Sequence, residues 1–331
     1  MGGGPRLFAA LDLGTNNCRL LIAAPQRTGF RAVEGYSKIV RLGEGLGVSG
    51  RLSEAAMERT ISALQTCAQR IAERGVTAVG CIATAACRVA ENGAEFLERV
   101  QRETGLSFRV ISPEEEARLA ALGCANLVDP AAEAALIVDV GGGSTEMSWL
   151  DAHAASRIGG GDLGVQLHAW GSRPVGVVTL AESAPESGDA DAWFAELVAT
   201  ARAQVAALSE DDAGLKALMA SDRAHIIGAS GTVTCLAGVH LDLKRYQRSR
   251  IDGVWLSRDD CVRATAKLLG MSRAERGAHP CIGAERADLI VPGCAILAAI
   301  LEAWPARKLR VADRGLREGV LMTLMAAKRG S

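Results

Sequence analysis

The stretch LIVDVGGGSTEMSW, residues 136–149, decides how the rest of this chain is interpreted. An apolar run ends at Asp139, the glycines Gly141, Gly142 and Gly143 follow, and an alternating segment resumes after Glu146. This pattern predicts two strands joined by a tight glycine turn. Glycines allow several backbone N–H groups to point at one phosphate. Acids at both ends of such a turn can hold a divalent cation or orient a water, so they favour a phosphate site over an ordinary glycine-rich turn.

Two other stretches repeat this kind of turn. Residues 6–24 predict two strands joined by Gly14, Thr15 and Asn16, with Asp12 at the end of the first strand. Residues 223–234 (RAHIIGASGTVT) predict a buried strand and a turn at which Gly231 and Thr232 open a helix, a position where backbone amides bind anions. The recurrence of strand, acid and glycine turn indicates a duplicated fold.

Length and element order predict two α/β domains. A chain of 331 residues exceeds one typical domain, and strands alternate with helices along it. We expect a first domain over residues 1–125 and a second over 126–314, with a helix at about 315–331 packing back on the first. Strand-like segments are expected to continue from the glycine turn to about residue 170.

The helix that begins after Ser112 carries three consecutive acids. Ser112 and Glu115 match the S-x-x-E capping box, and Pro113 suits the first helical position. Glu114 and Glu115 therefore have a structural explanation. Glu116 is not needed for the cap and is available for chemistry, the alternative being a solvated carboxylate on a helix surface.

Composition excludes several classes of protein. A net charge of −1 indicates neither nucleic-acid nor membrane binding, and no apolar run reaches the length of a membrane span. Nine cysteines without CxxC spacing predict reduced thiols and a cytoplasmic location. Walker A, GxGxxG, zinc-ligand and Ser-His-Asp patterns are absent. A basic cluster is either a solvated loop or a contact for the tail of a polyanion; it consists of Lys244, Arg245, Arg248 and Arg250.

Taken together, these motifs resemble a known fold and family. DLGTNNCRL (12–20), DVGGGSTE (139–146) and GASGT (228–232) resemble the phosphate-binding turns of the two-lobed actin/Hsp70/sugar-kinase (ASKHA, ribonuclease H-like) fold, whose active site lies in the interlobe cleft. ATAACR (83–88), ISPEEEARL (111–119), ERADLIVPG (285–293) and ADRGLREGVL (312–321) narrow the resemblance. They match, in order over nearly the whole chain, the short form of the exopolyphosphatase/guanosine-pentaphosphate phosphohydrolase (Ppx/GppA) family, without its C-terminal HD-like domain.

The resemblance implies roles for individual residues. Glu116 falls on the family's catalytic base, and Glu146 on the acid that assists it near Mg²⁺. Asp139, with Asp12, falls on the metal-associated acids. Arg88 falls on an arginine that contacts phosphate in the family. The backbone amides of Gly141 to Thr145, Ser144 among them, fall on amides that contact phosphate as well. Two departures from the family pattern are Asn17, where a small hydroxyl residue is usual, and Asp252-Gly253 in place of His-Gly.

The resulting hypothesis is an Mg²⁺-dependent, cytoplasmic, homodimeric exopolyphosphatase that releases orthophosphate from inorganic polyphosphate. Hydrolysis of guanosine pentaphosphate (pppGpp) to the tetraphosphate in the stringent response is the close alternative, and potassium is a candidate second cation. An ATP-binding kinase or chaperone-like ATPase, and a non-catalytic polyphosphate or alarmone sensor, are alternatives of another class.

Overall fold

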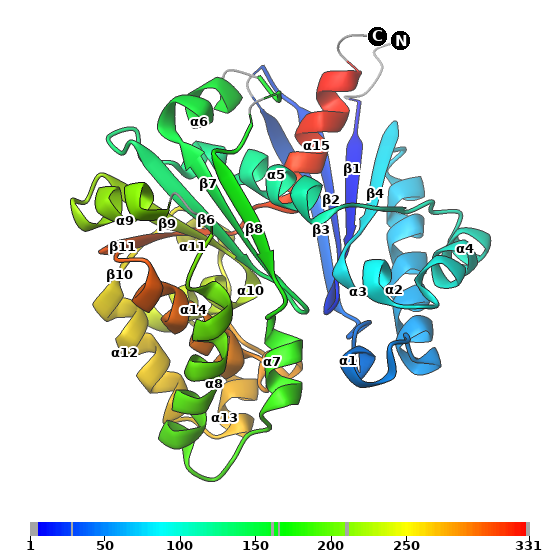
Figure 1. The fold of residues 1–331 in the computed structure, drawn as a ribbon. Helices are drawn as coiled ribbons and strands as arrows, with labels where there is room; N and C mark the ends of the chain where they lie inside the picture. Colours follow the sequence, from blue (N-terminus) through cyan, green and yellow to red (C-terminus); the bar gives the residue numbers. More distant parts are fainter. Residues whose placement is uncertain (1–5, 28, 160–161, 165, 209–211, 329–331) are drawn as a thin grey trace. The chain divides into compact units, whose positions relative to one another are not determined.

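The computed structural model describes residues 6–27, 29–159, 162–164, 166–208 and 212–328 (Figure 1). The chain divides into two compact units. The first comprises Met1–Gly123 with Leu316–Ser331, and the second comprises Cys124–Gly315. The last helix therefore belongs to the unit in which the chain begins.

The first unit is built on a five-stranded mixed sheet of order β3-β2-β1-β4-β5. Its strands are β1 (Phe8–Leu13), β2 (Asn17–Pro25), β3 (Phe30–Ile39), β4 (Ala78–Ala83) and β5 (Arg109–Val110). Its helices are α1 (Leu46–Ser49), α2 (Glu54–Glu73), α3 (Ala85–Val89), α4 (Gly93–Thr104), α5 (Pro113–Cys124, of which Cys124 is assigned to the second unit) and α15 (Leu316–Ala327).

The two faces of this sheet are covered by different helices. Alternate side chains of β1, such as Leu11, pack with α2 and α4 in one hydrophobic core. The opposite face packs against α15, and a Cβ at Gly80 of β4 would lie 2.8 Å from Val320 Cγ1. A Cβ at Gly319 of α15 would lie 2.0 Å from the Leu119 carbonyl oxygen, so α5 and α15 approach closely. The distant C-terminal helix thus completes the first unit.

The second unit is built on a six-stranded mixed sheet of order β10-β11-β9-β6-β7-β8. Its strands are β6 (Ala134–Val140), β7 (Thr145–Asp151), β8 (Ala169–Arg173), β9 (Ala224–Ala229), β10 (Trp255–Ser257) and β11 (Lys308–Ala312). Its helices are α6 (Ala152–Gly159), α7 (Val177–Ser183), α8 (Ala190–Val205), α9 (Asp212–Ala220), α10 (Gly231–His240), α11 (Arg248–Ile251), α12 (Arg258–Leu269), α13 (Arg273–Ala278) and α14 (Ile290–Ala303), with 3₁₀ turns at Ala125–Leu127 and Ala284–Arg286.

The two sheets share one topology. In the first unit β1 pairs antiparallel with β2 and parallel with β4, which pairs parallel with β5. In the second, β6 pairs antiparallel with β7 and parallel with β9, which pairs parallel with β11. The third strands, β3 and β8, extend the antiparallel side in both. This correspondence confirms the duplicated fold, and β10 is an addition to the second copy.

One local prediction was wrong. Residues 152–159, expected to be strand-like, form α6, because this Ala-rich segment favours a helix. Strand β5 spans only Arg109–Val110, whose side chains are exposed and so contribute little to the core. No helix in the described part of the chain is long and apolar enough to span a bilayer.

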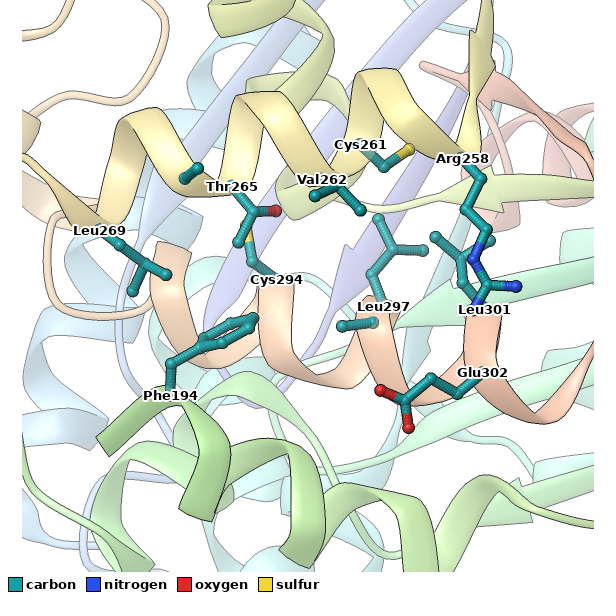
Figure 2. Close-up of a pocket in the computed structure, with 12 residues that line it drawn as sticks. Phe194, Arg258, Cys261, Val262, Thr265, Leu269, Cys294, Leu297, Leu301 and Glu302 are labelled. Carbon is teal, nitrogen blue, oxygen red and sulfur yellow. The ribbon is translucent and has the colours of Figure 1, made fainter. Parts of the chain in front are cut away.

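The helical layer of the second unit contains an apolar cavity of about 210 Å³ (Figure 2). It lies among α8, α12 and α14, and Phe194, Leu269, Leu297 and Leu301 contribute to its walls. None of the residues predicted for the phosphate site lines this cavity.

Candidate active site

The glycine turn between β6 and β7 is fixed by the start of α7. Within the turn, the Gly141 amide donates to the Ser144 carbonyl at 2.9 Å. The amides of Val177 and Val178 in α7 donate to the carbonyls of Gly141 and Gly142 at 2.9 and 2.8 Å. A Cβ at Gly176 would lie 2.4 Å from the Gly142 carbonyl oxygen, so only glycine permits this approach.

This arrangement engages the carbonyls of the turn and leaves amides available. Within the described part of the chain, no residue accepts a hydrogen bond from the amides of Gly142, Gly143 or Ser144. Gly142 and Gly143 are half-buried. Thr145 differs, because its side chain is fully buried and its hydroxyl donates to the Val175 carbonyl at 2.6 Å. The available donors are therefore backbone amides, which suit phosphate oxygens.

Two acids face each other at the mouth of this turn. Asp139 and Glu146 are direct partners in the β6–β7 ladder, so their side chains lie on the same face of the sheet. Glu146 is 4% exposed, and its Oε1 accepts a hydrogen bond from Ser172 Oγ at 2.9 Å. Gly315 lies beside the Asp139 carboxylate, since a Cβ there would be in van der Waals contact with Asp139 Oδ2 at 3.9 Å.

These acids fit magnesium chemically. Mg²⁺ prefers oxygen ligands and is usually held by one or two carboxylates together with waters and substrate phosphates. Within the described residues, no group of three or more His, Cys, Asp or Glu side chains forms a ready-made metal site. Asp139 and Glu146 are two carboxylates, which is the number that usually holds a magnesium ion bound to a phosphate.

The β1–β2 turn of the first unit is built on the same plan. The Gly14 amide donates to the Asn17 carbonyl at 2.9 Å, as Gly141 does to Ser144. The Thr15 carbonyl accepts from the Gly43 amide, and the Asn16 carbonyl from the amide of residue 40. No described residue accepts from the amides of Thr15 and Asn16. In both hairpin turns, carbonyls accept structural hydrogen bonds, and two or more amides have no acceptor among the described residues.

Asp12 lies on the face of this hairpin that packs against α15. It is paired in register with Arg19 on β2. Burial raises the pKa of Asp12; the positive charges of Arg19 and Arg317 oppose that rise, and Glu318 adds to it. Asp12 is therefore part of a charge cluster of the first unit, in which Asp12, Arg19 and Arg317 are half-buried.

Arg88 and Glu116, predicted from separate segments, lie together in the first unit. Arg88, in the last turn of α3, donates from Nη1 to Glu116 Oε2 at 3.1 Å and to the Ile111 carbonyl at 2.8 Å. Glu116 is 9% exposed, so the alternative of a solvated surface carboxylate does not describe it. The pair joins the start of α5 to α3.

The neighbouring acid has a different environment. Ser112 Oγ accepts from the Glu115 amide at 3.1 Å, which confirms the N-cap. The Glu115 carboxylate does not complete the capping box but binds Arg109 in a bidentate ion pair. That ion pair lowers the pKa of Glu115. Successive carboxylates on α5 thus serve different purposes.

The third turn, at the start of α10, is capped by a side chain. Ser230 Oγ accepts from the Val233 amide at 3.1 Å. No described residue accepts from the amides of Gly231 and Thr232. The Thr232 side chain is buried, and a Cβ at Gly293 of α14 would lie 2.2 Å from its Oγ1. Thr232 therefore offers its amide, while its hydroxyl packs inward.

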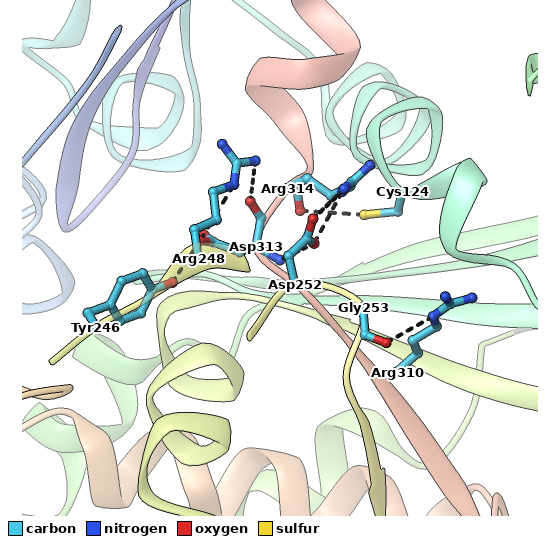
Figure 3. A network of polar contacts seen from close by, with 8 residues as sticks. All are labelled: Cys124, Tyr246, Arg248, Asp252, Gly253, Arg310, Asp313 and Arg314. Carbon is cyan, nitrogen blue, oxygen red and sulfur yellow. Dashed lines mark hydrogen bonds and ion pairs between the residues drawn. The ribbon is translucent and has the colours of Figure 1, made fainter. Parts of the chain in front are cut away.

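One member of the basic cluster, Arg248, contacts the segment that follows β11 (Figure 3). Arg248 Nη2 donates to the Asp313 carbonyl at 2.6 Å, and Tyr246 donates its hydroxyl to Asp313 Oδ2 at 2.8 Å. Lys244 is exposed and reaches Asp242 at 3.3 Å. Arg245 and Arg250 are exposed as well. Ala312 at the end of β11 pairs with Ala229 at the end of β9. Asp313, which follows β11, therefore lies near the α10 turn, which follows β9.

Several residues around these sites were not predicted. Ser172 holds Glu146, and Arg19 and Arg317 flank Asp12. Arg19 could have been found, because the hairpin register places it opposite Asp12. Asp252, noted only as a departure, accepts from the Asp313 amide at 3.0 Å and from Arg314 Nε at 3.0 Å. Nothing in the sequence links residues so far apart.

Comparisons with known proteins agree on one family. A family model described as the Ppx/GppA phosphatase family matches residues 21–328. A guanosine-5'-triphosphate,3'-diphosphate pyrophosphatase of Aeromonas salmonicida is 28% identical over 320 residues, which cover 96% of this chain and 59% of the relative. The chain thus spans 59% of the length of that curated relative.

Solved structures show the same fold. The crystal structure of the Aquifex aeolicus Ppx/GppA family member has a TM-score of 0.77 at 28% identity, covering 99% of this chain and 100% of that one. The crystal structure of an exopolyphosphatase-like protein has a TM-score of 0.82 at 29% identity, covering 98% and 100%. These matches confirm the predicted α/β, actin-like fold class and the family resemblance. The chain belongs to the Ppx/GppA phosphatase family, whose members are phosphoanhydride hydrolases.

Proposed function

We propose that this chain is an exopolyphosphatase, which removes terminal orthophosphate from inorganic polyphosphate. The observation that carries the proposal is the β6–β7 turn. The amides of Gly142, Gly143 and Ser144 have no acceptor among the described residues, and Asp139 and Glu146 face each other at the ends of the turn. Hydrolysis of a phosphoanhydride requires positioning and charge stabilisation more than covalent chemistry, and amides with acids supply both.

Each proposed residue has one task. Glu116 accepts the proton of the attacking water, and Arg88 orients that carboxylate and contributes positive charge for a phosphate oxygen. The amides of each glycine turn would bind phosphate oxygens. Asp139 and Glu146 would hold Mg²⁺, and Ser172 fixes the orientation of Glu146. When bound, the cation would neutralise charge on the phosphate that is transferred. Asp12 is a further candidate metal-associated acid beside the first glycine turn, and potassium is a second cation that can be tested.

The second candidate substrate is pppGpp. It is favoured by the relative of Aeromonas salmonicida, whose name describes action on guanosine pentaphosphate. Both substrates end in a phosphoanhydride, so the same acids and amides would act on either. The basic cluster favours the longer polyanion, because Lys244, Arg245 and Arg250 are exposed and could contact phosphates beyond the terminal one.

The test is phosphate release by the purified full chain with Mg²⁺ from long-chain polyphosphate, pppGpp and ATP. The proposal predicts the highest kcat/KM for polyphosphate. Release from pppGpp alone would select the second candidate. Turnover of ATP alone would indicate a kinase or chaperone-like ATPase, and saturable binding without release a sensor.

A matched set of variants separates the two phosphate substrates. Replacing Lys244, Arg245 and Arg250 together by Gln should raise KM for long polyphosphate several-fold and leave KM for pppGpp unchanged, because surface charges bind an extended anion weakly and additively. The same substitution at Arg27, Arg31 and Arg74 of the first unit is the control for net charge. Equal effects of both sets would contradict a polyanion contact at the cluster.

A further inference from the structure

We propose that the cavity among α8, α12 and α14 is a binding site for a small amphiphile with an apolar body and one anionic head group. The cavity belongs to the second unit and contains none of the residues assigned to phosphate hydrolysis. The proposal is therefore independent of the substrate of this family member.

The walls of the cavity define the apolar part of the ligand. Phe194 and Leu269 lie at one end of the row of labelled side chains, and Cys294 and Leu297 lie between the ends (Figure 2). Val262 on α12, which also lines the cavity, is 61% exposed. A cavity of 150 Å³ lined by apolar side chains binds benzene. A volume of about 210 Å³ therefore suits a body of roughly six to eight carbon atoms.

The other end of the cavity carries charge. Arg258, at the start of α12, lies there with Leu301 and Glu302 (Figure 2). No described residue forms a side-chain hydrogen bond or an ion pair with the Arg258 guanidinium. Glu302 is already engaged, because Arg202 Nε donates to its Oε2 at 2.8 Å. This end is therefore positive and complements one anionic group.

The middle of the cavity is uncharged at neutral pH. Burial raises the pKa of Cys261 and of Cys294 to about 12, so both thiols remain protonated. The Thr265 hydroxyl is in hydrogen-bond contact with Cys294. A polyphosphate or nucleotide would place several charges against these groups, and an organic cation would meet Arg258. The lining favours an alkyl or aryl monoanion.

The test is isothermal titration of the full chain with octanoate, and with octanol as the uncharged ligand of similar shape. Octanoate should bind saturably with one site per chain, and octanol several-fold more weakly. Arg258→Gln should weaken octanoate binding by about 3-fold, the range of an exposed ion pair, and leave octanol unchanged. Arg263→Gln is the matched control, because Arg263 lies on the same helix but pairs with Asp260 outside the cavity.

The second experiment fills the cavity with a larger side chain. Ala266 and Ala298 both line the cavity. Ala266→Phe and, separately, Ala298→Phe should abolish binding of both ligands while thermal unfolding stays cooperative. Because Ala266 is exposed, it should tolerate the larger ring best. Absence of saturable octanoate binding to the wild type would overturn the proposal. Equal binding of octanoate to the wild type and to a folded Ala266→Phe variant would overturn it as well. Octanol binding as tightly as octanoate would overturn the anionic head group.

Discussion

At the scale of residues, the Arg88–Glu116 pair distinguishes one carboxylate of α5 from its neighbours. Glu116 is 9% exposed and held by a guanidinium that also binds the Ile111 carbonyl. The first-turn acid Glu115 is instead occupied by Arg109. Identical side chains in successive positions thus acquire different roles from their partners.

Arg88→Ala should lower kcat/KM by about 10- to 100-fold, the effect of losing a hydrogen bond to a charged group. Both kcat and KM should change, because the guanidinium orients Glu116 as well as contributing charge for a phosphate. Arg88→Lys should recover part of KM but little of kcat, since an ammonium lacks the rigid planar geometry with which the guanidinium orients Glu116. Steady-state kinetics on the preferred substrate would show this. A variant with unchanged kcat would contradict the orienting role.

Asp12→Asn should increase the free energy of unfolding at neutral pH. Burial raises the pKa of Asp12, so the folded state binds its proton more tightly than the unfolded chain does. The stability contributed by Asp12 is therefore fully present below its unfolded pKa and is lost as the pH rises through the folded pKa. The advantage of Asn should shrink as the pH falls toward the ordinary pKa of Asp. Urea unfolding of both proteins at several pH values measures this, and a difference of opposite sign would contradict it.

At the scale of elements, the glycine turns show which parts of the candidate site a sequence pattern can predict. Acid, glycine run and alternating apolar residues fix the β6–β7 hairpin, and its register then places Asp139 opposite Glu146. The contact of α7 with the β6–β7 turn, called the clamp below, was not predictable, because it depends on where the folded chain places Gly176. Similarly, Ser172 reaches Glu146 only because β8 pairs with β7 in register.

Gly176→Ala tests the clamp. The added Cβ would lie 2.4 Å from the Gly142 carbonyl, so the turn or α7 must move. We expect a loss of about 1–3 kcal/mol in stability, typical of overpacking, together with a large loss of activity. Gly188→Ala is the control, because a Cβ there meets nothing within 4 Å. Denaturant unfolding and phosphate release measure the two effects; a Gly176→Ala protein as stable and active as the control would contradict the clamp.

At the scale of the whole molecule, the order of elements along the chain was largely predictable and the packing was not. Alternating strands and helices and the two hairpins gave the duplicated α/β fold, which the shared strand order confirms. The segment of α6 was expected to be strand-like although its alanines favour a helix, and α9 was not predicted at all. Distant pairs such as Asp252 with Arg314 require the folded chain to bring them together.

The position of α15 predicts how fragments behave. Residues 124–315 form the second unit without interruption, whereas the first unit needs 316–331. The fragment 1–123 should not unfold cooperatively alone, because the sheet face at Gly80 would lose its contact with Val320. Joining 316–331 to it through a flexible linker should restore a cooperative transition. Circular dichroism melts would show this, and a cooperative transition of 1–123 alone would contradict it.

The most direct test of the proposed hydrolysis compares Glu116→Gln with Glu115→Gln by phosphate release with Mg²⁺ and by equilibrium binding of the same substrate. Glu116→Gln should reduce kcat by about 10²–10⁴-fold, the usual contribution of a general base, and should retain substrate binding. Glu115→Gln, altered one position earlier on the same helix, should release phosphate at nearly the wild-type rate. Near-wild-type turnover by Glu116→Gln, or equal losses in the two variants, would contradict the assignment of Glu116 as the base.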